Sequence, residues 1–191
     1  MALPILVGLI AVGFVVLVAL WVILAYNGLI GLKLQGENAF KQIDVQLKRR
    51  HDLIPNLVGA VKGVMKFEQE TLEKVMAARN KAVSAGTMGD RARSESELTG
   101  VLGRLFAVVE NYPQLKSNEQ VRTLMEELSH TENTLGFSRQ LYNDVATRYN
   151  TKIQVFPSNV VAGFFHFAAQ ELFQITDETE RETPKVDLSL S

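Results

Sequence analysis

The residues of this chain best suited to chemistry are charged and polar side chains that recur at helical spacing. They are Arg49, Arg50, Asp52, Asn56, Glu132, Arg139 and Asn143. Because residues three, four or seven positions apart share a helix face, they form an upstream stripe (residues 49–56) and a downstream stripe (residues 132–143). If the two helices run antiparallel, the stripes can face each other. A buried charge needs a partner before it needs a ligand, so we expect a structural polar network that fixes helix register. A ligand or partner site is the alternative.

A metal site is the second chemical possibility. Glu127 and His130 form a Glu-x-x-His motif, which is one half of a carboxylate-bridged di-iron site. That chemistry requires a second Glu-x-x-His and two bridging glutamates, and the sequence has no second copy. We therefore expect no metal, and we expect both side chains to lie on a solvated face.

Other catalytic signatures are missing from the sequence. It has no cysteine, no Gly-x-Ser-x-Gly nucleophile elbow and no glycine-rich phosphate loop followed by Lys-Ser/Thr. With 20 Lys and Arg against 21 Asp and Glu, the formal net charge is −1, so no basic field attracts nucleic acid. The sequence thus predicts no catalytic residue, no cofactor, no nucleic-acid partner and no enzymatic activity.

The N-terminal segment predicts a membrane anchor. From Leu3 to Tyr26 there is no charged residue, and about 22 helical residues span ~33 Å against a hydrocarbon core of ~30 Å. A cleaved signal peptide is the alternative, but residues 1–4 contain no Lys or Arg, and Leu24-Ala25-Tyr26 is a poor cleavage site. We expect a retained anchor in the bacterial inner membrane.

The orientation of the anchor follows from its flanking charges. Lys33 and Lys41 follow the apolar segment, whereas its N-terminal side offers only the α-amino group. The positive-inside rule then predicts a cytoplasmic bundle with the N-terminus outside.

Two long helices with apolar seams must position the polar stripes. One seam comprises Phe40, Ile43, Leu47, Arg50, Ile54, Leu57, Val61 and Val64, and the other comprises Val121, Leu124, Leu128, Thr131, Leu135, Ser138, Tyr142, Val145 and Tyr149. Both keep the alternating three-four spacing of packed helices, so each is expected to cover the other. Only scattered glycines separate the first seam from the anchor, so both can belong to one helix, with a bend predicted at Pro55.

Shorter helices complete the predicted bundle. One covers residues 67–84 and stops at the glycine-containing stretch 85–89, and the next is expected to begin at a cap on Ser94 or Ser96. Tyr112-Pro113 breaks the chain before Ser117 and Asn118 open the second long helix. A final short helix is expected after Pro157.

The last helix is apolar on more than one face. Its surplus of aromatic residues, Phe164, Phe165 and Phe167, predicts an assembly surface. Coverage of the bundle end by these residues and contact with the bilayer surface are the alternatives.

Several phrases in order along the chain resemble the LemA family. They are Tyr26-Asn27, residues 44–58 (DVQLKRRHDLIPNLV), residues 75–79, residues 110–116 (ENYPQLK), residues 131–133, Arg139 with Tyr142-Asn143, Tyr149-Asn150 and Phe156-Pro157-Ser158. The resemblance implies a single-pass bacterial membrane protein with an antiparallel helical bundle and no established enzymatic activity. Some family members are encoded near membrane metalloproteases or magnetosome components, and some relatives look periplasmic.

We therefore expect an all-α protein whose N-terminal transmembrane helix continues into an antiparallel bundle of long helices. The expected boundaries are an anchor at 1–26, a bundle domain at 27–175 and a disordered polar tail at 176–191. The expected function is a self-associating, membrane-organising scaffold. The alternative is an accessory or sensor subunit that binds an envelope partner such as a membrane metalloprotease or a transporter.

Overall fold

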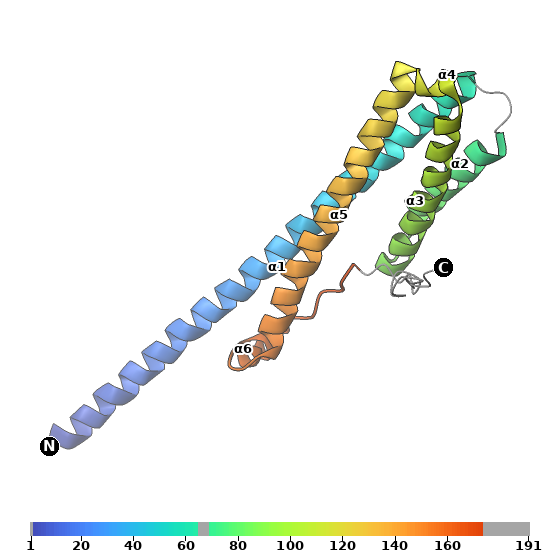
Figure 1. The fold of residues 1–191 in the computed structure, drawn as a ribbon. Helices are drawn as coiled ribbons and strands as arrows, with labels where there is room; N and C mark the ends of the chain where they lie inside the picture. Colours follow the sequence, from blue (N-terminus) through green and yellow to red (C-terminus); the bar gives the residue numbers. More distant parts are fainter. Residues whose placement is uncertain (1, 65–68, 174–191) are drawn as a thin grey trace, which may run out of the picture. The chain divides into compact units, whose positions relative to one another are not determined.

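The computed structural model describes residues 2–64 and 69–173, which form helices and no strand. The helices are α1 (Ala2–Val64), α2 (Gln69–Ser84), α3 (Met88–Asn111), α4 (Pro113–Lys116), α5 (Glu119–Gln154) and α6 (Ser158–Phe164) (Figure 1). The all-α prediction is confirmed. The expected polar tail at 176–191 lies outside the described residues.

The N-terminal apolar segment and the first seam belong to one helix, as predicted. Helix α1 runs from Ala2 to Val64 with Pro55 inside it. The helix continues through this proline, and Ile54 and Leu57 on either side of it are fully buried. The bend at Pro55 stays a prediction.

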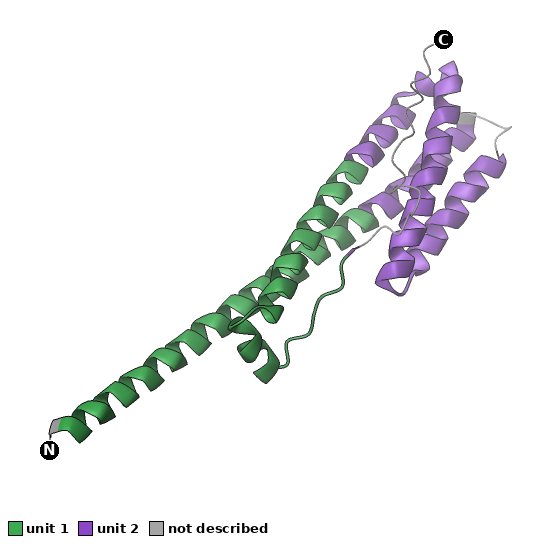
Figure 2. Cartoon of the chain, turned by 60° about the horizontal axis from the view of Figure 1, so that its bottom comes forward, with its two compact units in different colours: residues 1–48, 131–172 green, residues 49–130, 173–191 purple. Residues whose placement is uncertain are grey.

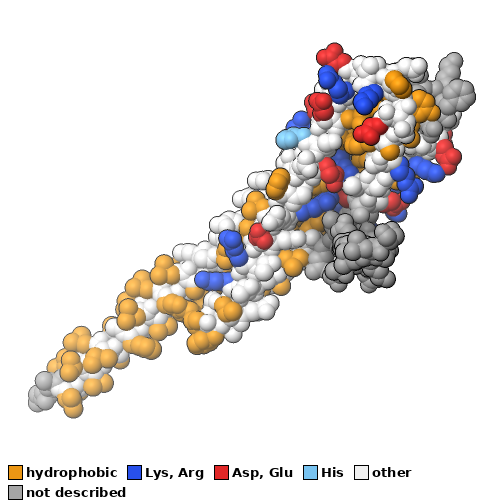
Figure 3. Space-filling model, viewed as in Figure 1, with side chains coloured by type: hydrophobic (Ala, Val, Ile, Leu, Met, Phe, Trp, Pro, Cys, Tyr) orange, Lys and Arg blue, Asp and Glu red, His pale blue; other side chains and the backbone are white. Residues whose placement is uncertain are grey.

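The first part of α1 is apolar on all sides and exposed. Large side chains from Leu3 to Leu24 are mostly more than half exposed, and the apolar side chains in Figure 3 crowd this end of the helix. Within the described part of the chain, α1 is the one helix long and apolar enough to cross a membrane. A helix that is hydrophobic all round requires an apolar surrounding, and the described residues leave this part of α1 uncovered.

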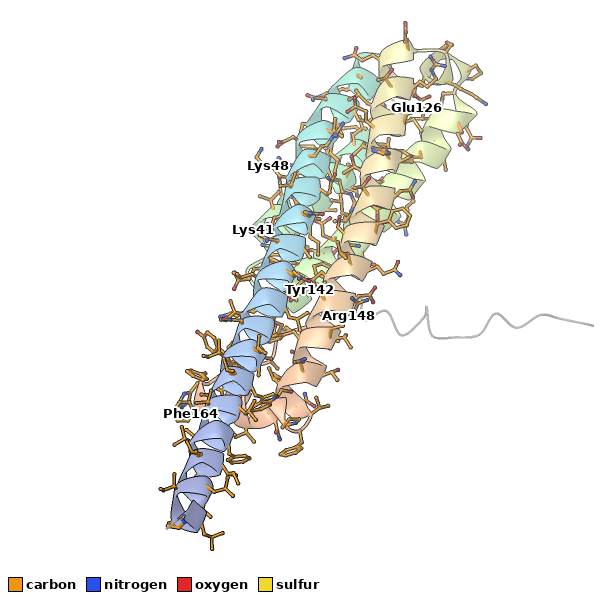
Figure 4. All side chains as sticks on the ribbon, turned by 90° about the vertical axis from the view of Figure 1, so that its left-hand side faces the viewer. Lys41, Lys48, Glu126, Tyr142, Arg148 and Phe164 are labelled. Atoms are coloured by element: carbon orange, nitrogen blue, oxygen red, sulfur yellow. The ribbon has the colours of Figure 1, made fainter. Side chains whose placement is uncertain are left out.

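The chain divides into two compact units: unit 1 comprises residues 1–48 and 131–172, and unit 2 comprises residues 49–130 and 173–191 (Figure 2). In unit 1, α1 and α5 run antiparallel. The ring of Phe40 lies 5.5 Å from that of Tyr142, while Leu29 clusters with Ile153 farther along α5. Figure 4 shows Tyr142 between the two helices. The seam residues Leu135, Tyr142 and Tyr149 are buried as predicted.

Unit 2 contains the larger apolar core. It is built from one face of each of its helices: Ile54, Leu57, Val61, Leu72, Val75, Ala78, Ala82, Leu98, Leu102, Leu105, Val109, Leu115, Val121 and Leu128. The repeat of three or four residues within each helix is the reason that these side chains reach one interior.

Local signals set most helix ends, and one of our predictions was wrong. Helix α3 begins at Met88, capped by the Thr87 hydroxyl, which accepts the Asp90 N–H at 3.1 Å. The predicted cap at Ser94 or Ser96 is therefore incorrect: Ser94 lies inside the helix and its hydroxyl donates to the Asp90 carbonyl at 2.7 Å. A Thr cap contributes about 1 kcal/mol, which offsets the ~1 kcal/mol cost of Gly89 in the first turn.

The other helix ends agree with the sequence. Helix α2 ends at Ser84, and α3 ends at Asn111, just before Tyr112-Pro113. Asn118 caps α5 by accepting the Val121 N–H at 3.1 Å.

Residues 168–171 of unit 1 form an extended segment along α5 that our sequence analysis did not predict. The Tyr149 hydroxyl donates to the Ala168 carbonyl at 3.0 Å, and Asn150 makes two hydrogen bonds with the backbone of Gln170 at 2.8 and 2.9 Å. The Tyr142 hydroxyl donates to the Glu171 carbonyl at 2.5 Å. The amide end of the Gln170 side chain lies directly over Gly36 of α1 and would have to shift if this residue had a Cβ. We call residues 168–171 the C-terminal strap.

Replacing Tyr142 with Phe tests the strap. Burial and the nearby Glu171 carboxylate raise the pKa of Tyr142 above its usual 10.0, and burial raises the pKa of Tyr149. Stability that depends on these neutral hydroxyls is present below pH 10.0 and is lost as the pH rises through the folded-state values. Tyr142→Phe removes one hydrogen bond and should lower the free energy of unfolding by about 1 kcal/mol at neutral pH.

The measurement is chemical denaturation followed by circular dichroism at neutral pH and at successively higher pH. Tyr142→Phe should also make the alkaline loss of stability shallower. The control is Tyr112→Phe, the same chemical change in unit 2, which leaves the hydrogen bonds of the strap in place and should lower the free energy of unfolding at neutral pH by less than Tyr142→Phe does. An alkaline profile equally steep in wild type and Tyr142→Phe would show that the strap bond does not contribute.

Candidate functional site

A buried ion cluster connects three helices of unit 2. Arg50 occupies a position of the α1 seam between Leu47 and Ile54, so its side chain points inward with theirs. Its Nη1 donates to Glu95 Oε2 of α3 at 2.9 Å, and the two side chains are 2% and 0% exposed. This is a fully desolvated ion pair.

Additional hydrogen bonds surround this pair. Arg50 Nη2 donates to the Thr99 hydroxyl at 2.7 Å, and His51 Nε2 lies 2.6 Å from Glu95 Oε1. Arg79 of α2 donates from Nε to the His51 carbonyl at 3.1 Å. Both oxygens of the Glu95 carboxylate therefore have partners, and α1, α2 and α3 are joined at one level.

The closure of the cluster decides what it can do. A substrate cannot reach Glu95, because its side chain is fully buried and both carboxylate oxygens are occupied. Desolvating an ion pair costs several kcal/mol, and such a pair is retained where it specifies how elements fit together. The arrangement therefore suits alignment of helices and not catalysis.

The structure places the residues of the predicted network as follows. Arg49 is half-exposed and donates to Glu127 at 3.5 Å, while Asp52 and Asn56 are exposed. Arg50 is buried, but its partner Glu95 was not among our candidates. Glu95 lies between Ser94 and Ser96, the two residues that we predicted as caps of a helix start, and we therefore did not consider it as a buried partner. Glu132, Arg139 and Asn143 are half-buried in unit 1. Whether the two stripes form one network stays a prediction.

The Glu-x-x-His motif has another local role. Glu127 pairs with Arg49 and His130 is exposed. Across residues 2–64 and 69–173, no group of three or more His, Asp or Glu side chains is placed to hold a metal ion.

The second candidate feature is an open groove in unit 2, about 1040 Å³ in volume. It is lined by Pro55, Asn56, Gly59 and Ala60 of α1 and by Asn118, Glu119, Gln120, Thr123 and Leu124 near the start of α5. The lining offers amides, a hydroxyl, one carboxylate and apolar surface, without a nucleophile next to a base. Such a surface suits binding. Our sequence analysis did not predict this groove: it assigned Pro55 to a bend and Asn56 to the structural polar network.

The predicted assembly surface lies in unit 1. Phe164 is 77% exposed and Phe165 is 44% exposed, whereas Phe167 is half-buried against the cluster of Leu29, Val161 and Ala162. Phe167 is thus used within the chain, and Phe165 contacts the ring of Tyr26. Whether another subunit covers the exposed parts of this surface stays a prediction.

Comparison with known proteins gives a consistent set of relatives. The family model described as LemA family matches residues 39–188. Protein LemA of Metamycoplasma hominis is 28% identical over 156 residues, which cover 81% of this chain and 69% of that protein. Magnetosome protein MamQ 2 of Paramagnetospirillum magneticum is 25% identical over 178 residues, covering 80% of this chain. Magnetosome protein MamQ of Magnetospirillum gryphiswaldense is 23% identical over 177 residues, covering 79%. The chain spans 65% of the length of each of these magnetosome proteins.

Replacing Glu95 with Gln tests the ion cluster. The change leaves the buried Arg50 guanidinium without its counter-charge, so we expect a loss of about 3–5 kcal/mol in the free energy of unfolding, measured by chemical denaturation. Glu97→Gln is the matched control. Glu97 lies two positions after Glu95 on α3 and pairs with Lys81 of α2, but both side chains of this pair are about half exposed or more. That change should cost no more than about 1 kcal/mol. Equal losses for the two variants would contradict a special role for the buried pair.

Proposed function

Because this chain belongs to the LemA family, we propose that it is a single-pass membrane protein whose helical bundle self-associates as a non-enzymatic scaffold. The observation that carries the proposal is the two-part surface of α1. Its first part, through Leu24, exposes apolar side chains on every face, and its later part buries one face in the bundle. One continuous helix thereby joins an anchor to a protein-binding body.

The proposed location is the bacterial inner membrane with the bundle in the cytoplasm. Lys33 and Lys41 of α1, the second labelled in Figure 4, are exposed and follow the apolar segment directly. Basic residues next to a span are retained on the cytoplasmic side.

A non-enzymatic role is supported by how the charged residues are used. Glu95 and Arg50 neutralise each other in the interior, and Glu127 pairs with Arg49. The LemA family is not a known enzyme family.

Self-association is supported by a second seam on α5. Asn133, Gly136, Phe137, Gln140 and Leu141 are all exposed and uncharged, and they keep the three-four spacing of a coiled-coil contact. Phe137 is 73% exposed, and Gly136 faces open space where another helix can approach closely. We call these five residues the outer stripe. A second copy of this chain, presenting the same stripe, is the occupant that we propose, since identical chains associate most often through self-complementary patches.

The relatives favour an organising role. Two of them are named magnetosome proteins, which supports a function in building a membrane structure. The second candidate function is an accessory or sensor subunit that binds a membrane protease or transporter. The groove beside Pro55 is the observation that favours it, because it offers a concave surface for a peptide segment.

Self-association is tested by native mass measurement of the full chain in detergent micelles. We expect a homo-oligomer for the wild type and a shift to the monomer for the double variant Phe137→Ser/Leu141→Ser. Both side chains are exposed, so the helical circular dichroism should be unchanged. The control is Val83→Ser, an equally exposed apolar residue on α2, which should leave the mass unaltered. A monomeric wild type would overturn the scaffold and favour the accessory subunit.

Topology is tested separately with a reporter fused after Ser191. We expect a fluorescent protein at this position to be bright and an alkaline phosphatase to be inactive, because the bundle is proposed to be cytoplasmic. The same reporters placed before Met1 provide the control and should give the reverse pattern. An active phosphatase after Ser191 would place the bundle on the other side.

A further inference from the structure

Helix α6 packs against α1 at the end of the apolar span. Leu29 of α1 forms a buried cluster with Val161 and Ala162 of α6. The half-buried residues around this cluster are Val22, Ala25, Tyr26, Ile153 and Phe167. All these residues belong to unit 1.

The aromatic contacts place α6 at the same level of α1. The ring of Tyr26 lies 4.7 Å from that of Phe165 and 5.7 Å from that of Phe167. From Leu3 to Val22 the rise of the helix is about 29 Å, close to the ~30 Å thickness of a hydrocarbon core. Residues 22–29 of α1 therefore lie where the span leaves the hydrocarbon, and α6 lies beside them.

The outward face of α6 is apolar and unusually exposed. Val160 and Phe164 are four residues apart on α6 and are 61% and 77% exposed, and Phe156, in the turn before α6, is 81% exposed. Figure 4 shows Phe164 on α6 beside the membrane-proximal part of α1. From Ile153 to Gln170 the chain contains no Asp, Glu, Lys or Arg. Three large exposed apolar side chains in one uncharged segment are unfavourable in water.

Hydrogen bonds satisfy the backbone at the C-terminal end of α6. At its end the Phe167 N–H donates to the Ala162 carbonyl at 2.9 Å and the His166 N–H donates to the Gly163 carbonyl at 3.2 Å. This is a Schellman motif, with His166 at φ 55° in the left-handed region. No side chain caps the start of α6, where the Ser158 hydroxyl instead donates to the Lys152 carbonyl in the last turn of α5 at 2.6 Å. The capped C-terminal end of α6 lowers the cost of leaving water, because unpaired backbone groups are expensive in lipid.

We propose that α6 is a second membrane-contacting element, lying in the lipid–water interface with Phe156, Val160 and Phe164 inserted among the lipid chains. The occupant of this face is the leaflet from which α1 emerges. We favour lipid over a second protein because the exposed apolar surface of α6 is continuous with that of α1. The two surfaces meet at Tyr26 and Val22, where the all-apolar part of α1 ends. The inference rests on α1 being the anchor and is independent of self-association through the outer stripe.

The proposal is tested by fluorescence quenching of the full chain in vesicles of phosphatidylcholine and phosphatidylglycerol. Phe164→Trp is introduced into a Trp21→Phe background, so that it carries the only tryptophan. Phosphatidylcholine brominated near the glycerol end of its acyl chains then serves as the quencher. Interfacial helices bury their apolar faces about 5–10 Å deep, so we expect roughly two-fold quenching. Phe156→Trp in the same background should behave alike.

Two controls bracket the result. The wild type carries Trp21 inside the span and should be quenched, which verifies the anchor independently. Val83→Trp in the Trp21→Phe background, an exposed position in unit 2, should emit at long wavelength without quenching. Unquenched, long-wavelength emission from Phe164→Trp would overturn the proposal. Unquenched but blue-shifted emission would also overturn it, in favour of a second protein chain over this face.

Discussion

The structure depends on one helix that meets two different surroundings. Helix α1 continues without interruption from Ala2 to Val64, but its surface changes along its length. Through Leu24 it is apolar on every side, and from Leu29 onward only one face is buried. The hydrophobic effect acts on both parts: it drives the first into a bilayer and drives the second against neighbouring helices. Because no helix break separates them, α1 itself carries the connection between the anchor and the first seam.

The interior of unit 2 shows how a charge can be accommodated in such a seam. Arg50 occupies a position that a leucine fills one turn earlier, and its charge is matched by the Glu95 carboxylate. Thr99 accepts a second hydrogen bond from Arg50, and His51 lies against the other oxygen of Glu95. A fully apolar replacement could pack equally well, so the pair is better explained by specificity than by stability. Arg50 in the seam favours one register of α1 against α3, because in any other register Arg50 or Glu95 would be buried without its partner.

The segment after α5 serves unit 1 in two ways. The strap runs back along α5, and side chains of Tyr142, Tyr149 and Asn150 donate hydrogen bonds to its backbone carbonyls. These bonds replace the backbone hydrogen bonds that a neighbouring strand would supply in a sheet. Before the strap, α6 closes the cluster around Leu29 and leaves a second aromatic face exposed. A bundle that meets the bilayer at α6 as well as through α1 would have a fixed orientation relative to the membrane surface. The scaffold that we propose would need this property, because self-association would require its subunits to present their outer stripes in one plane.

The sequence by itself determined the features that depend on local pattern. Uncharged length predicts the anchor, three-four spacing predicts the seams of α1 and α5, Tyr112-Pro113 marks the end of α3, and Asn118 marks the start of α5. The start of α3 at Thr87 could also have been predicted, since Thr-x-x-Asp is a capping signal. We instead assigned residues 85–89 to a break because of the glycines beside Thr87. Only the tertiary structure decided that Arg50 pairs with Glu95, that the strap bonds to Tyr142, and that Pro55 lines a groove with residues of α5. Spacing shows which side chains share a face, but partners 29 or 45 positions apart depend on which faces meet and at what register. That choice is made by the packing of the whole chain.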